Sequence, residues 1–111
     1  MTDRERKFLQ DILVSIHSIE EFLGPKKNFE AYLANKMLRR AVERELEIIG
    51  EALNQLDKSA PELKIGSKRQ IIGMRNRVIH GYDSIDDKIV WGTLIRHLPE
   101  LKREVEALLL A

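Results

Sequence analysis

Cysteine is absent from this chain of 111 residues, and proline and aromatic residues are scarce. Without cysteine there is no disulfide framework and no thiolate zinc site. Phe, Trp and Tyr make up only 5% of the chain, which disfavours a base-stacking platform for single-stranded nucleic acid. Because no apolar run is long enough to span a bilayer and the first residues are too charged for a signal peptide, we expect a cytoplasmic protein without a membrane partner.

The chain also lacks an excess of charge of either sign. Its 19 basic and 18 acidic residues give a formal net charge of +1, so any basic site must come from local clustering. The length predicts a single domain, residues 1–111, small enough to gain from pairing with a second copy of itself. A hydrophobic content of 43% with 33% charged residues is typical of a soluble, helix-rich protein.

Apolar residues recur at helical spacing along most of the chain, and no alternating strand pattern is present. We therefore expect an all-α fold, an up-and-down bundle of four principal helices with short extra helical segments. Pro99 either kinks the last helix or separates a final piece from it. The predicted helices cover residues 2–23, 28–56 with a candidate break at 33–35, 67–79, and 84 onward.

Short polar side chains mark the predicted helix starts. Asn28 is a candidate N-cap, and three capping boxes have the required spacing of three residues. Gly81 stands where a glycine often follows a helix end. Gly50 lies inside the second run, where it costs about 1 kcal/mol relative to alanine, and a close helix crossing would explain it. The three boxes are Thr2 with Glu5, Ser67 with Gln70, and Ser84 with Asp87.

Two rows of charge run along the second helix. The basic row of Lys36, Arg40 and Arg44 has the spacing of a solvated helix face. We expect the acidic row to pair locally with nearby arginines, and Glu45 to be a flanking residue or a buried polar contact in the dimer. His17 and His97 lie on different predicted helices, and neither has other potential metal ligands at a suitable spacing, so we predict no metal site. The acidic row consists of Glu43, Glu47 and Glu51.

The segment from residue 75 to residue 82, RNRVIHGY, holds the most chemistry. On a regular helix Arg75 and His80 differ by about 140° around the axis and share no face, whereas Asn76 and His80 do share one. A helix ending near Ile79 would let Arg75 and His80 border one cleft. His80 can then exchange protons near neutral pH, Arg75 can bind phosphate oxygens with its fork, and Asn76 can orient either partner.

These groups are sufficient for RNA cleavage without a metal, with a base for the 2′-hydroxyl, a cation for the phosphorane and an acid for the leaving oxygen. One histidine does not easily fill both proton-transfer roles, so a two-fold dimer would supply the second group. Lys68, Arg69 and Arg77 are candidate RNA-binding residues. The same side chains also have purely structural interpretations. Arg75 can be a solvated surface residue, His80 can stabilise a helix end, and Tyr82 can be a packing residue.

The motif and its flanks resemble the HEPN superfamily, and more narrowly the HepT-like toxins. The resemblance covers most of the chain and rests on residues 48–53 (IIGEAL), 71–82 (IIGMRNRVIHGY), 84–86 (SID) and 90–91 (VW). It implies a helical bundle that pairs as a two-fold dimer, with both motifs lining one cleft. It also implies a metal-independent endoribonuclease that needs no cofactor, with Arg75 and His80 catalytic and Asn76 supporting.

The resemblance further implies a type II toxin–antitoxin system. The implied partner is a nucleotidyltransferase-fold antitoxin that binds the toxin and transfers adenylyl groups from ATP to Tyr82. Such groups would add bulk and negative charge beside the phosphate site. Two alternatives stay open: a non-catalytic HEPN helical module that binds a nucleotide or a partner protein, and a bundle that uses the motif only for dimer packing.

Overall fold

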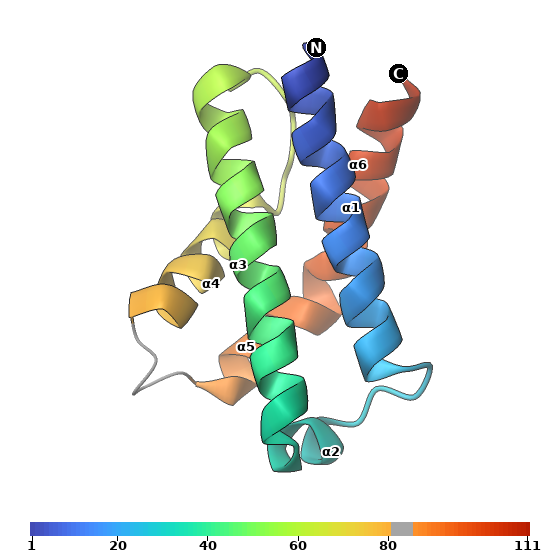
Figure 1. Cartoon of the computed structure of the whole chain (residues 1–111), viewed down its shortest axis with the longest axis vertical. Coiled ribbons are helices and arrows are strands. Elements are labelled where there is room, and N and C mark those ends of the chain that lie inside the picture. The colour runs from blue at the N-terminus through green and yellow to red at the C-terminus, as the bar shows by residue number, and fades with distance from the viewer. Residues whose placement is uncertain (81–85) are drawn as a thin grey trace.

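The computed structural model describes residues 1–80 and 86–111, and it describes residues 77–80 as backbone only. All regular structure in these residues is helical, which confirms the all-α prediction (Figure 1). No helix within the same ranges is long and apolar enough to cross a membrane. The helices are α1 (Asp3–Leu23), α2 (Phe29–Ala34), α3 (Lys36–Ser59), α4 (Lys68–His80), α5 (Asp87–Arg96) and α6 (Leu98–Leu110).

The first three helices begin and end close to their predicted residues. Thr2 and Glu5 form the predicted capping box, with the Thr2 hydroxyl accepting from the Glu5 N–H at 3.1 Å. Asn28 caps α2, as its position predicted. Asn35 ends α2 and caps α3 by accepting from the Leu38 N–H, so the candidate break inside residues 28–56 is confirmed.

The start of α5 differs from the prediction. The helix begins at Asp87, and its N-cap is Asp86, whose carboxylate accepts from the Lys88 N–H at 2.9 Å. The predicted capping box of Ser84 with Asp87 is therefore wrong, because aspartate caps a helix as well as serine does and Asp86 lies closer to the helix. Ser84 itself lies outside the described residues.

Pro99 separates two helices. The α5 helix ends at Arg96, His97 lies between the helices, and α6 begins at Leu98. Pro99 occupies the first turn of α6, where its missing N–H would have no intrahelical partner in any case.

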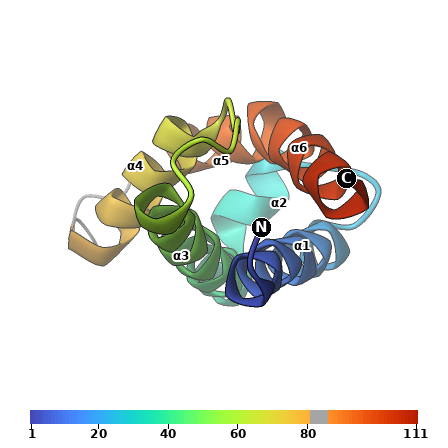
Figure 2. The ribbon, with the colours of Figure 1, turned by 90° about the horizontal axis from the view of Figure 1, so that it is seen from above.

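Three helices, α1, α3 and α6, run side by side along the long axis of the molecule, and α4 crosses the outer side of α3 (Figures 1 and 2). The core lies mainly between α1 and α3, where the predicted apolar faces meet. Side chains of α4, α5 and α6 complete it. Its fully buried members include Leu9, Ile12, Ile16, Ile19, Leu46, Ile49, Leu53, Ile71, Leu101 and Val105.

The carboxylate of Glu43 is buried where α2, α3 and α5 meet. Glu43 is only 6% exposed, whereas Glu45 is half-buried, so Glu43 is the buried carboxylate of this helix. Burial raises the pKa of Glu43 against the opposing effect of Arg40. Burial also raises the pKa of the neighbouring Tyr32, whose ring packs 5.3 Å from that of Trp91. These contacts hold the start of α5, where the chain returns from the motif segment.

Candidate active site on helices α3 and α4

The α4 helix, which carries most of the motif, is anchored at its start and along its inner face. Glu104 of α6 accepts hydrogen bonds from the Gly66 N–H at 2.6 Å and from the Ser67 hydroxyl at 3.1 Å. Ser67 precedes α4 as predicted, but the predicted capping box with Gln70 is wrong, because the Ser67 hydroxyl donates to Glu104 instead of accepting from the Gln70 N–H. Ile71 and Met74 are buried in the core and fix the rotation of α4 about its axis.

Arg75 lies directly over Gly50 of α3. A Cβ atom at Gly50 would stand 2.2 Å from Cβ and 2.6 Å from Cγ of Arg75, far inside van der Waals contact. The close helix crossing predicted from Gly50 is confirmed, and the residue that crosses there is the arginine of the motif. Only glycine allows α3 and α4 to approach this closely at this point.

The guanidinium of Arg75 binds the next residue of α3. Its Nη2 is 2.6 Å from Oε2 of Glu51, and its Nη1 donates to the Asn76 side-chain oxygen at 2.9 Å. The other carboxylate oxygen of Glu51 accepts from the Gln55 amide at 3.1 Å. Within the described part of the chain, Nε of Arg75 is buried without a hydrogen-bond partner.

The three glutamates of the acidic row of α3 therefore differ in their partners. Glu43 and Glu47 pair with Arg40 and Arg44 one turn away, as predicted. Glu51 does not pair locally and instead binds Arg75, 24 residues along the chain. Sequence reasoning missed Glu51 as a site residue, although its position beside the glycine of the helix crossing is a usable signal.

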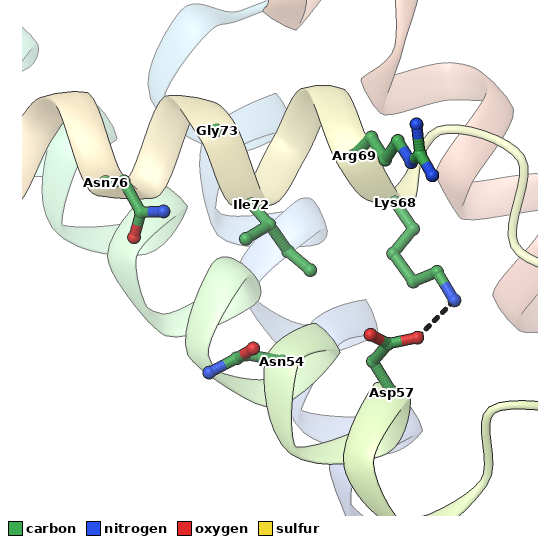
Figure 3. A pocket seen from close by; sticks show the side chains of 7 residues that line it. All are labelled: Asn54, Asp57, Lys68, Arg69, Ile72, Gly73 and Asn76. Atoms are coloured by element: carbon green, nitrogen blue, oxygen red, sulfur yellow. Dashed lines mark hydrogen bonds and ion pairs between the residues drawn. The ribbon is translucent and has the colours of Figure 1, made fainter.

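A polar groove of about 620 Å³ lies between α3 and α4 (Figure 3). From α4, Asn76, Ile72 and Lys68 point toward α3, while the guanidinium of Arg69 points away from it. Lys68 forms an ion pair of 2.5 Å with Asp57 at one end of the groove. The groove is lined by Asn54, Asp57, Lys68, Arg69, Ile72, Gly73 and Asn76.

The predicted site residues are distributed unequally over this surface. Lys68, Arg69, Arg75 and Asn76 all lie on α4, and three of these four line the groove. Arg77 and His80 lie on the same helix, where the structure describes only their backbone. Gly81 and Tyr82 lie outside the described residues.

The helix continues through His80, one residue beyond the end expected near Ile79. Positions 75 and 80 therefore remain about 140° apart around the helix axis and do not share a face within one chain. Position 80 instead follows Ile72 and Asn76 at intervals of four residues, on the face that lines the groove. Among the residues that line the groove, Asn76 is nearest in sequence to position 80, and Arg75 lies on the side of α4 that faces α3.

The basic row of α3 lies outside the groove. Arg40 and Arg44 of the basic row are mostly exposed and paired with their own helix, as expected of a solvated face. Among the described residues, no three His, Asp or Glu side chains gather in a way that could hold a metal ion.

Comparison with known proteins gives a consistent result. Residues 12–108 match the family described as Ribonuclease HepT-like. The "Putative RNase MJ1380" of Methanocaldococcus jannaschii is 37% identical, covering 96% of this chain and 98% of its own length. The "Probable ribonuclease HepT" of Thermococcus cleftensis is 36% identical, covering 97% and 98%.

A third relative, the "Putative RNase TTE0752" of Caldanaerobacter subterraneus, is 39% identical over 74% of each chain. No solved structure matches this chain. The family match spans most of the chain and includes α4 with its arginine, its groove and the position of His80. The chain therefore belongs to the HepT-like ribonuclease family.

Proposed function

We propose that this protein is a metal-independent endoribonuclease and the toxin of a type II toxin–antitoxin system. The main support is the surface of α4, where Asn76 lines a polar groove and accepts a hydrogen bond from Arg75, which Glu51 of α3 holds. The family and the names of its relatives support a ribonuclease. The near-neutral net charge agrees with a local RNA site on α4.

In the proposed reaction, a base removes the proton of a 2′-hydroxyl, and the oxygen attacks the adjacent phosphorus. The bond from phosphorus to the 5′-oxygen then breaks, and an acid protonates that oxygen, leaving a cyclic phosphate and a 5′-hydroxyl. Arg75 stabilises the charge that develops on the phosphorane oxygens. His80 transfers one of the protons.

The second proton transfer supports a dimer. His80 is the only histidine of the motif, and the nearest other histidines in the sequence lie on α1 and after α5. A two-fold dimer would bring a second His80 to the same phosphodiester. A monomer mass by sedimentation at micromolar concentration would refute this arrangement.

RNA contacts are proposed along α4. Lys68 and Arg69 stand at the start of the helix, about 18 Å from His80 at 1.5 Å per residue. Together with Arg77 they would bind the RNA backbone on either side of the cleaved bond, in a salt-dependent way. Asn76 lines the groove between them and would orient the phosphate or His80.

The test of this function is cleavage of RNA by the purified protein, freed of any antitoxin and unmodified at Tyr82. We expect wild type to cut RNA in the presence of a chelator and to leave cyclic phosphate ends. Intact RNA under these conditions would refute the ribonuclease proposal. The non-catalytic alternative requires Arg75→Ala to keep the biological effect, which the ribonuclease proposal excludes.

Control of the toxin is proposed to occur at Tyr82, in the cytoplasm. A nucleotidyltransferase-fold antitoxin would bind the protein and transfer adenylyl groups to the Tyr82 hydroxyl. Their negative charge would repel the phosphate of RNA beside Arg75. Co-expression with such a partner should raise the intact mass by whole adenylyl groups, and an equal mass gain in Tyr82→Phe would exclude this acceptor.

A further inference from the structure

The arginine of the motif is held by two neighbouring residues of another helix. Gly50 admits the stem of Arg75 against the α3 backbone, and Glu51 binds its Nη2 at 2.6 Å. The Arg75 side chain is only 23% exposed, although a surface arginine is ordinarily solvated. Its stem and its guanidinium are therefore both fixed by α3.

We propose that Glu51, together with Gly50, is a positioning element that orients the Arg75 guanidinium for the phosphate of RNA. The inference rests on the proposed ribonuclease function and extends it to residues outside the motif. Glu51 acts through Arg75 and is not a catalytic residue.

The geometry distinguishes this contact from an ordinary surface ion pair. Glu47 and Arg44, one turn earlier on α3, pair within the helix with the arginine 68% exposed, and such pairs are weak. The Glu51 contact instead joins two helices and uses both carboxylate oxygens, one on Arg75 and one on Gln55. It also combines with the steric fit at Gly50, which the Glu47 pair lacks.

The position of Glu51 also has an electrostatic consequence. A carboxylate beside the proposed phosphate site repels the RNA backbone, so Glu51 does not increase the affinity of the protein for RNA. An arginine that is fixed before RNA arrives needs no reorganisation as the phosphorane charge develops. Glu51 should therefore contribute to the rate of the bound complex and not to RNA binding.

The first test compares Glu51→Gln with the matched control Glu47→Gln on the same helix. Glutamine keeps the size of the side chain and removes its charge. For Glu51→Gln we expect kcat to fall by about 100-fold while KM stays unchanged or decreases. Glu47→Gln should keep both parameters near wild type, and Glu51→Asp should restore part of the lost kcat.

The second test uses Gly50→Ala, with Gly92→Ala as its control. A Cβ at Gly92 meets nothing within 4 Å, whereas one at Gly50 collides with the stem of Arg75. We expect Gly50→Ala to lose cleavage by about 100-fold, and Gly92→Ala to retain it. If Gly50→Ala does not fold, as judged by circular dichroism, the Glu51 variants still decide the proposal.

A structural measurement makes the result independent of cleavage. In wild type the Arg75 Nε–H, identified by its loss in Arg75→Lys, should exchange slowly with solvent in NMR spectra because it is buried. Exchange should become fast in Glu51→Gln and stay slow in Glu47→Gln. Equally slow exchange in Glu51→Gln would overturn the positioning proposal, even if wild type proved inactive.

Kinetics separate the remaining outcomes. If wild type cuts RNA and Glu51→Gln cuts equally well, the ribonuclease proposal stands and the positioning role fails. A rise in KM at constant kcat would assign Glu51 to RNA binding and would also overturn it. Inactive wild type with Arg75 loosened by Glu51→Gln would refute the ribonuclease function alone.

Discussion

Replacing His80 by alanine should reduce the rate of RNA cleavage by about 10²- to 10⁴-fold, the range for loss of a general acid or base. The imidazole is the group of the motif whose ordinary pKa allows proton transfer near neutral pH. The measurement is the single-turnover rate on a labelled RNA with chelator present. Binding of RNA should change little, since Arg75 and the basic residues of α4 are retained.

The matched control for this prediction is His17→Ala. His17 is exposed on α1, outside the groove between α3 and α4, and its loss should leave the rate unchanged. Cleavage by His80→Ala at the wild-type rate would remove His80 from the mechanism. If His80→Ala only weakened the dimer, the motif would serve packing, which the same sample in sedimentation would show.

Replacing Leu46 by alanine should lower the free energy of unfolding by about 2–5 kcal/mol. Leu46 is fully buried on α3, in the core that α3 forms with α1. The substitution removes apolar contacts and leaves a cavity that the surrounding helices fill only in part. Because a small domain has about 5–15 kcal/mol of stability, much of it would be lost.

Denaturant titration followed by circular dichroism measures this effect. The same substitution at Leu110, which is 88% exposed at the end of α6, should change stability by less than about 0.5 kcal/mol. Equal midpoints for the two variants would contradict the assignment of the core.

Much of the fold could be predicted because its signals are local in the sequence. The capping box of Thr2 and Glu5 depends only on side chains three residues apart, and it is present in the structure. The cap at Asn28 and the helix break near residues 33–35 were also predicted from local residues, and of the two alternatives for Pro99 the structure shows the separation of two helices. The predicted capping box of Ser84 with Asp87 was wrong because Asp86, directly before α5, caps that helix.

Contacts between helices could not be predicted in the same way. Glu43, Glu47 and Glu51 occupy equivalent places in one row, yet Glu43 is buried, Glu47 is paired on the surface and Glu51 binds another helix. Their spacing is identical, so only the packing of α2 and α4 against α3 distinguishes them. The burial of Glu43 has the same cause.

The sequence by itself determined the all-α class, most helix boundaries, the family, and the candidate chemistry of Arg75, Asn76, His80 and Tyr82. These depend on periodicity, caps and motif spacing, which are properties of neighbouring residues. The tertiary structure alone decided what surrounds Arg75. Gly50 and Glu51 reach it only because α3 and α4 cross closely, and such a crossing depends on the shapes of two distant helices.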